Sequence, residues 1–176
     1  MKSNKSAVRY ATALLELATE HNKVELIEQD ILQLLKTAEE VHDFQVFLNS
    51  PLIIIDKKIA VIKQIFTDFN QTTIDFLSLV TQNGRETVMI DIAKQFVSLL
   101  KAQRGIVPIT IISAQQLEDH TKQSILSKIS AAITGTAEIT EQIDADLIGG
   151  FIVRMGDHQI DASVATQLKR LKQQFV

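Results

Sequence analysis

Apolar residues recur at helical spacing along almost the whole chain up to Arg104. In the clearest example, the stretch 23–40, the apolar residues share one face of a helix: Val24, Ile27, Ile31, Leu34, Leu35 and Ala38. Further stretches of this kind follow with short connections between them. Together they predict about six helices arranged as an antiparallel bundle.

Residues that end or begin helices separate these stretches. Ser50 precedes Pro51, and a residue before proline is pushed out of the α region. The Asn83-Gly84 pair and Gly105 tolerate the left-handed conformation found at helix C-termini. Two helices have candidate N-caps, whose side-chain oxygens accept early backbone N–H groups: Asp56, and Thr72 or Thr73.

The hydrophobic period changes after Gly105, where β-branched residues begin to dominate. The pattern predicts strands at 106–113, 137–144, 147–155 and 158–161, and helices at 115–134 and 163–176. Pro108 favours an edge strand or a strand start, because proline donates no hydrogen bond to a sheet. The predicted fold class is therefore α+β: an N-terminal six-helix bundle over 1–105, and a small C-terminal α/β domain with a β-hairpin and two helices over 106–176.

Composition narrows the classes of function. The net charge is −3 with both signs interspersed, and the chain has one tyrosine and no tryptophan. A nucleic-acid-binding protein normally shows a basic surface or stacking aromatics, so that class is disfavoured. No apolar run reaches about 18 residues and the N-terminus lacks a signal-peptide pattern, so we expect neither a membrane span nor secretion. The absence of cysteine excludes disulfides, thiolate metal sites and cysteine nucleophiles.

The stretch DADLIGGFIVRMGDHQIDASV, at 144–164, fits a phosphate loop, a metal site or a structural element. A phosphate loop needs spaced glycines that open a helix, whereas Gly149 and Gly150 run into an apolar strand. A metal site lacks the calcium-loop spacing, and no second histidine lies near His158. The metal interpretation would use these candidate ligands: Asp144, Asp146, Asp157, His158 and Asp161.

The structural interpretation of this stretch fits best. Gly149 and Gly150 mark a bulge or a point where a neighbouring backbone comes close. Asp157 belongs to a turn, and either Asp161 or Ser163 caps the last helix. We therefore expect no metal and no cofactor.

The first helix is apolar over more than one face. One stripe consists of Ala7, Ala11, Leu14 and Ala18, and the other consists of Tyr10, Ala13 and Leu17. A surface helix needs only about a 100° apolar stripe to face its own core. The surplus fits a central bundle helix and equally a helix that forms a groove for a partner helix. The pattern alone does not decide between them.

The C-terminal stretch resembles the signature of the delta subunit of F-type ATP synthases, the family of the mitochondrial oligomycin-sensitivity-conferring protein. Here the signature is filled by Ile148-Gly149-Gly150, Arg154, Gly156-Asp157 and Ile160-Asp161. The segments RYATALLELA near the N-terminus and NGRE at 83–86 also resemble that family. The resemblance runs from Val8 to Leu171.

This resemblance implies a non-catalytic stator subunit. In the family, the N-terminal bundle binds the N-terminal helix of an α subunit, and the C-terminal domain contacts the b subunits of the peripheral stalk. The groove would lie between the first and fifth helices, and the implied partner-binding residues are Tyr10, Ala13, Leu14, Leu17, Phe76 and Val80. The expected location is the cytoplasmic face of a bacterial inner membrane, with membrane contact only through the complex.

Three functions are therefore weighed. A hydrolase or metal-dependent enzyme lacks any paired nucleophile and base in the sequence. A stator adaptor and a helical scaffold of another multisubunit complex share the same physical features. Only the family signature separates these two, and it favours the stator.

Overall fold

The computed structural model describes residues 5–115, 135–156 and 158–174. The predicted helix at 115–134 and the turn residue Asp157 thus lie outside the described residues, apart from Gln115. The chain divides into two compact units, residues 1–100 and residues 101–176. Each unit has its own hydrophobic core.

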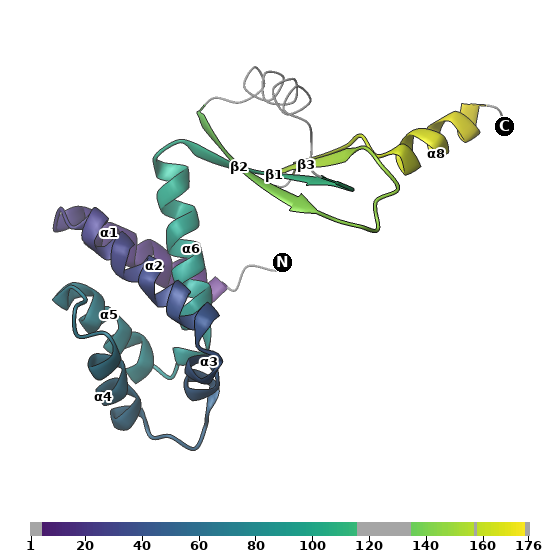
Figure 1. Ribbon diagram of the computed structural model, residues 1–176. Helices are drawn as coiled ribbons and strands as arrows, with labels where there is room; N and C mark the ends of the chain where they lie inside the picture. Colours follow the sequence, from purple (N-terminus) through teal and green to yellow (C-terminus); the bar gives the residue numbers. More distant parts are fainter. Residues whose placement is uncertain (1–4, 116–134, 157, 175–176) are drawn as a thin grey trace. The chain divides into compact units, whose positions relative to one another are not determined.

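The first unit is helical (Figure 1). Its elements are α1 (Lys5–Glu20), α2 (Val24–Glu40), α3 (His42–Asn49), α4 (Ile55–Ile65), α5 (Gln71–Gln82), the short 3-10 helix η1 (Glu86–Val88) and α6 (Met89–Gln103). All six α-helices contribute buried side chains to one apolar cluster, which includes Leu14, Ile31, Leu48, Ile62, Leu77 and Phe96. The helical periodicity of the sequence therefore corresponds to packing around a shared core.

The predicted helix ends are confirmed. The helix α3 ends at Asn49, and its C-cap Ser50 is extended, as expected before proline. Gly84 follows the C-cap of α5 with a φ of 64°, and Gly105 follows α6 with a φ of 67°. Both glycines adopt the left-handed conformation that a β-carbon would strain.

The predicted N-caps of α4 and α5 are wrong. Asp56 lies in the first turn of α4, whose N-cap is Ile54 without a side-chain hydrogen bond. The N-cap of α5 is Asn70, whose side-chain oxygen accepts a hydrogen bond from the backbone N–H of Thr72 at 3.1 Å. Asn70 comes before the two predicted threonines in the chain, and its side chain accepts the hydrogen bond from an otherwise unpaired backbone N–H at the start of α5.

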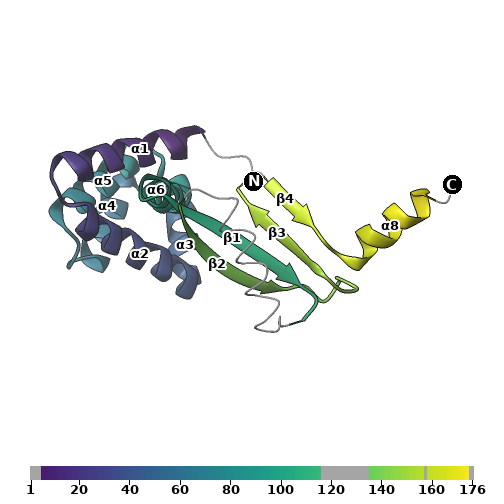
Figure 2. The same cartoon turned by 90° about the horizontal axis from the view of Figure 1, so that it is seen from above.

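The second unit contains a four-stranded sheet in the order β2-β1-β3-β4, which is seen from above in Figure 2. Its elements are β1 (Ile106–Ser113), β2 (Thr136–Ile143), β3 (Phe151–Met155), β4 (His158–Asp161) and the final helix α8 (Val164–Gln174). The β1–β2 pair is parallel, whereas β1–β3 and β3–β4 are antiparallel. Among the described residues of this unit, Ile109, Ile111 and Val153 form a buried apolar cluster.

Two strand predictions need correction. The strand β1 is an inner strand, not an edge strand, but only its residues from Ile109 onward pair with β3. Pro108 is the third residue of β1, so it does not start the strand, but among the described strands it pairs only with β2 and therefore has one edge free of pairing. The strand β3 begins at Phe151, so Gly149 and Gly150 precede the strand and form no bulge within it.

Candidate functional site

The two apolar stripes of α1 differ in their exposure to solvent. Ala7, Ala11, Leu14 and Ala18 are all 0% exposed and belong to the core. In the second stripe, Tyr10 and Leu17 are half-buried and Ala13 is exposed. The helix therefore faces the core of its unit on one side and still presents apolar surface on another.

The helix α5 contacts this second stripe. The rings of Tyr10 and Phe76 meet edge to face, with their centroids 6.5 Å apart and an interplanar angle of 72°. Such a contact contributes about 1 kcal/mol beyond burial. We call the surface formed by Tyr10, Ala13 and Leu17, where it adjoins Phe76, the α1–α5 face.

The structure separates the predicted partner-binding residues into surface and core. Leu14 and Val80 are 0% exposed, and Phe76 is 8% exposed. Leu14 and Val80 thus lie beneath the α1–α5 face in the isolated chain, and their assignment as partner-binding residues stays a prediction. Sequence analysis missed Leu79, which is 49% exposed on α5. Its position three residues after Phe76 places it on an adjacent side of that helix.

A polar cluster fixes α5 against α2. The carboxylate of Asp30 accepts hydrogen bonds from the backbone N–H of Asn70, at 2.9 Å, and from the hydroxyl of Thr73. Asp30 and Thr73 are buried, so both groups would be costly to leave unpaired. Lys23 adds longer contacts of 3.4 Å to the side chains of Asn70 and Thr72. The start of α5, and with it the ring of Phe76, is held in one position.

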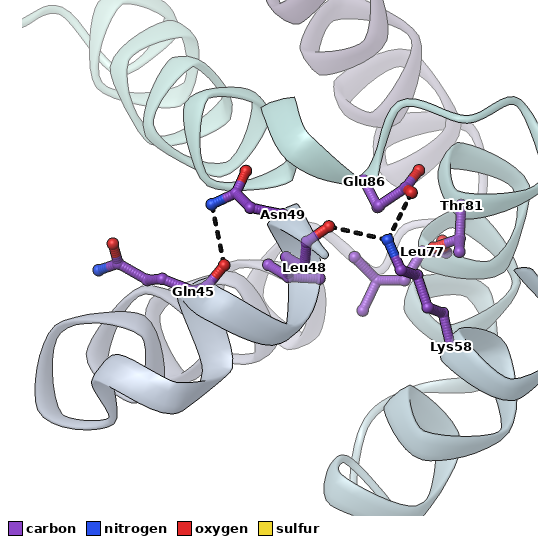
Figure 3. A network of polar contacts seen from close by, with 7 residues as sticks. All are labelled: Gln45, Leu48, Asn49, Lys58, Leu77, Thr81 and Glu86. Carbon is purple, nitrogen blue, oxygen red and sulfur yellow. Dashed lines mark hydrogen bonds and ion pairs between the residues drawn. The ribbon is translucent and has the colours of Figure 1, made fainter. Parts of the chain in front are cut away.

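A buried ion pair holds the other end of the α5 segment (Figure 3). The Lys58 ammonium donates to Glu86 Oε1 at 2.7 Å and to the Leu48 carbonyl at 3.0 Å. The Lys58 side chain is 3% exposed and that of Glu86 is 12% exposed. Burial raises the pKa of Glu86, but the hydrogen bond and charge of Lys58, with a backbone hydrogen bond, hold that pKa below its ordinary value of 4.5.

This pair joins α4, the end of α3 and η1. Sequence analysis did not identify it, although Lys58 lies four residues before the core residue Ile62 and hence on the buried face of α4. Glu86 Oε2 is the one buried side-chain oxygen or nitrogen without a hydrogen-bond partner in the described part of the chain. The pair is thus a structural clamp with one unsatisfied atom.

The glycine pair of the C-terminal signature lies against the start of α8. Gly150 has a φ of 79°, and a β-carbon there would lie 2.4 Å from the Ala162 carbonyl oxygen. Two backbone hydrogen bonds close this contact: Ala162 N–H donates to Phe151, and Val164 N–H donates to Gly149, each at 3.0 Å. The close backbone approach expected from the sequence is present here.

The polar residues of the signature also stabilise the local fold. Asp161 accepts hydrogen bonds from the Ser163 N–H and the Thr166 hydroxyl, each at 2.8 Å. Hydrogen bonding from Ser163, through its side chain first and then its backbone, and from Thr166 lowers the pKa of Asp161. Ser163 in turn accepts from the Thr166 N–H at 3.3 Å, so both predicted capping residues act at this helix start. Arg154 donates to Gln159 at 3.2 Å across the β3–β4 hairpin, and Gly156 has a φ of 54° in its turn.

Metal-binding geometry is not formed by the signature residues that the structure describes. Asp144 accepts a hydrogen bond from the Asp146 N–H at 3.0 Å within its own turn. Within 5–115, 135–156 and 158–174, no group of three histidine, aspartate or glutamate residues could hold a metal ion. Asp157, a candidate in the sequence, lies outside these ranges.

A helical unit and a small mixed sheet define an α+β protein whose C-terminal motif stabilises the local fold around the start of α8. The profile of the family described as ATP synthase delta (OSCP) subunit matches residues 7–175. The chain belongs to this family.

Individual relatives agree with that assignment. The chain is 32% identical to ATP synthase subunit delta of Christiangramia forsetii, over 99% of this chain and 95% of the relative. It is 34% identical to that of Carboxydothermus hydrogenoformans, over 98% and 97%. A chain in the structure of the Toxoplasma gondii mitochondrial ATP synthase hexamer has the same fold, with a TM-score of 0.74, 23% identity and 96% coverage of both chains.

Family membership gives the general role. The chain is a non-catalytic stator subunit of an F-type ATP synthase, and its partners are other subunits of that membrane-associated complex. In the described part of the chain, no helix is long and apolar enough to cross a membrane.

Proposed function

We propose that the α1–α5 face binds the N-terminal helix of an ATP synthase α subunit, while the C-terminal domain contacts the b subunits of the peripheral stalk. In this proposal, residues 1–105 form a six-helix bundle and residues 106–176 form the stalk-binding domain. The subunit links the catalytic α/β hexamer to the stalk, so that neither rotates with the central shaft. The bacterial source of the two relatives supports a location at the cytoplasmic face of the inner membrane.

The observation that carries the proposal is the second apolar stripe of α1. Tyr10, Ala13 and Leu17 follow the spacing i, i+3, i+7, which is the spacing that an amphipathic helix uses to contact another helix. The first stripe supplies the fully buried core contact of α1, whereas the second is only partly used for packing within the unit. It therefore has the composition of a binding surface.

Ala13 has a particular place in this surface. It is exposed and lies between two larger half-buried side chains, Tyr10 and Leu17. A small residue there lets a partner helix approach the α1 backbone closely. Burial of apolar area contributes about 25 cal/mol per Å² before the costs of association are subtracted.

We expect Ala13→Leu to weaken binding of a peptide that copies the N-terminal helix of the α subunit. The larger side chain fills the space for the partner, while both residues are good helix formers. The loss should be about 2 kcal/mol, roughly a thirtyfold drop in affinity. Calorimetric titration of the peptide into the full-length protein measures it.

Ala60→Leu is the matched control, because Ala60 is an exposed alanine on α4 outside the α1–α5 face. The control should bind the peptide like the unmodified protein, and circular dichroism should show the same helix content in all three proteins. Equal affinities for Ala13→Leu and Ala60→Leu would place the binding surface elsewhere.

The domain proposal predicts that residues 1–105 fold without the rest of the chain. The first apolar cluster draws its buried side chains from α1 to α6 and neighbouring turns, and its last member is Leu100. The fragment should be strongly helical by circular dichroism and should melt in one cooperative transition. A broad, non-cooperative transition would show that this boundary is wrong.

A further inference from the structure

A pocket of about 590 Å³ lies at the N-terminal end of α1, beside the turn that follows α5. The residues that line it come from these two segments: Lys5, Ser6, Arg9, Tyr10, Asn83 and Arg85. Segments far apart in the sequence therefore meet here. Tyr10 belongs both to this pocket and to the α1–α5 face, so the two surfaces are continuous.

The pocket is strongly basic. Three of its lining residues, Lys5, Arg9 and Arg85, are cations exposed to solvent. None of the residues that line the pocket carries a carboxylate. None of the three forms an ion pair with a carboxylate of the described residues. The chain as a whole carries a net charge of −3, so this cluster contrasts with the rest of the protein.

Nearby sequence does not neutralise the cluster. No aspartate or glutamate precedes Glu16 in the chain. Glu86 directly follows Arg85, but one of its oxygens is engaged by Lys58 and the other is buried. The start of α1 adds a favourable field for anions, because its first backbone N–H groups point toward this end.

The arrangement of Arg9 joins charge to the apolar surface. Its guanidinium lies 5.8 Å from the centroid of the Tyr10 ring. A guanidinium in this position can bind a carboxylate with its N–H groups while its planar face contacts an aromatic ring. A ligand for this site should therefore carry a carboxylate next to apolar side chains.

We infer that the basic pocket binds one or more carboxylate side chains at one end of the partner helix, and so fixes the direction in which that helix lies along α1. The inference rests on the proposed binding of a partner helix to the α1–α5 face. The apolar stripe alone would accept a helix in either direction. A cluster of positive charge at one end distinguishes the two directions, because only one of them brings the acidic end of the helix to the pocket.

The test is a titration of the α-subunit peptide into the full-length protein at low and high salt. Neutralising the pocket with Lys5→Gln, Arg9→Gln and Arg85→Gln together should weaken binding at low salt by about tenfold, since each exposed pair contributes modestly. The salt dependence of the affinity should largely disappear in this variant. Ala13→Leu should instead lose affinity and keep its salt dependence.

The matched control removes three positive charges elsewhere, with Lys36→Gln, Lys57→Gln and Lys63→Gln on α2 and α4. All three lysines are exposed and lie outside the pocket. Control and pocket variants carry the same net charge, so any difference between them reports the location of the charge. Circular dichroism should show that both remain folded.

The outcomes separate this inference from the proposed function. If the unmodified protein does not bind the peptide, the proposed function fails. If it binds and the pocket variant matches the control variant at every salt concentration, the basic pocket has no role. A peptide with its carboxylates converted to amides should bind like the pocket variant binds the original peptide. Undiminished binding of that peptide would overturn the assignment to a peptide carboxylate.

Discussion

Gly150→Ala should unfold the C-terminal unit and leave the helices α1 to α5 intact. The added β-carbon would lie 2.4 Å from the Ala162 carbonyl oxygen and 2.9 Å from Ser163 Cα, which are backbone atoms with little freedom to move. The φ of 79° is also unfavourable for a residue with a β-carbon. Overlap and backbone strain together should cost about 4 kcal/mol.

Hydrogen exchange measured by mass spectrometry can follow each unit separately. Amides in β1 and β3 should exchange on the order of a thousandfold faster in Gly150→Ala, or lose protection altogether. Amides in α1 and α5 should be unchanged, and the α-subunit peptide should still bind.

Gly156→Ala is the matched control for this substitution. Gly156 also has a positive φ, 54°, but a β-carbon there would meet no atom within 4 Å. The control therefore includes the backbone strain, about 1 kcal/mol, without the overlap. Equal protection of the sheet in both variants would show that the close approach at Gly150 does not matter.

Lys58→Met should destabilise the helical unit by about 3 kcal/mol, because it leaves the largely buried Glu86 carboxylate without its partner. The substitution also removes the donor to the Leu48 carbonyl. Lys63→Met on the same helix α4 is the control, since Lys63 is exposed and should matter by less than about 0.5 kcal/mol. Urea denaturation followed by circular dichroism measures both.

The double variant Lys58→Met with Glu86→Leu separates charge from packing. If the cost of Lys58→Met comes from the uncompensated carboxylate, removing that carboxylate should recover most of the stability. A double variant as unstable as Lys58→Met alone would instead assign the cost to lost packing around the lysine.

The acidity of Glu86 gives the same pair a dependence on pH. Its pKa in the folded protein is lowered, so ionisation of this group favours the folded state. That contribution is complete above the ordinary value of 4.5 and is lost as the pH falls through the lowered pKa. The stability difference between the unmodified protein and Glu86→Gln should therefore shrink on acidification below about pH 4.5 and stay constant above it.

Periodicity was sufficient to predict the helices that the structure describes and the double character of α1. An apolar stripe at helical spacing must face something apolar, and α1 has more of these positions than its core uses. Periodicity does not give the depth at which a residue lies, however. Leu14 and Val80 are fully buried, and the family resemblance could not indicate this because it transfers positions and carries no information on exposure.

Contacts between segments distant in the chain could not be predicted from the sequence. Lys58 and Glu86 are 28 residues apart, and nothing in their local patterns links them. The role of Asp30 was not predicted either. Its carboxylate accepts a hydrogen bond from the hydroxyl of Thr73, 43 residues away, and this is the hydroxyl that was expected to cap α5. The basic pocket depends on the same kind of proximity, since Arg9 and Arg85 meet only after the helices have packed.

The position of Tyr10 makes the protein its own optical reporter. Tyr10 is the single tyrosine of a chain without tryptophan, so intrinsic emission excited near 280 nm comes from the α1–α5 face alone. A change in the surroundings of this ring can be read without attaching a dye and without a background from other parts of the protein. A partner free of tyrosine and tryptophan could thus be titrated by ordinary fluorimetry, on the unmodified subunit and on every variant that retains this residue.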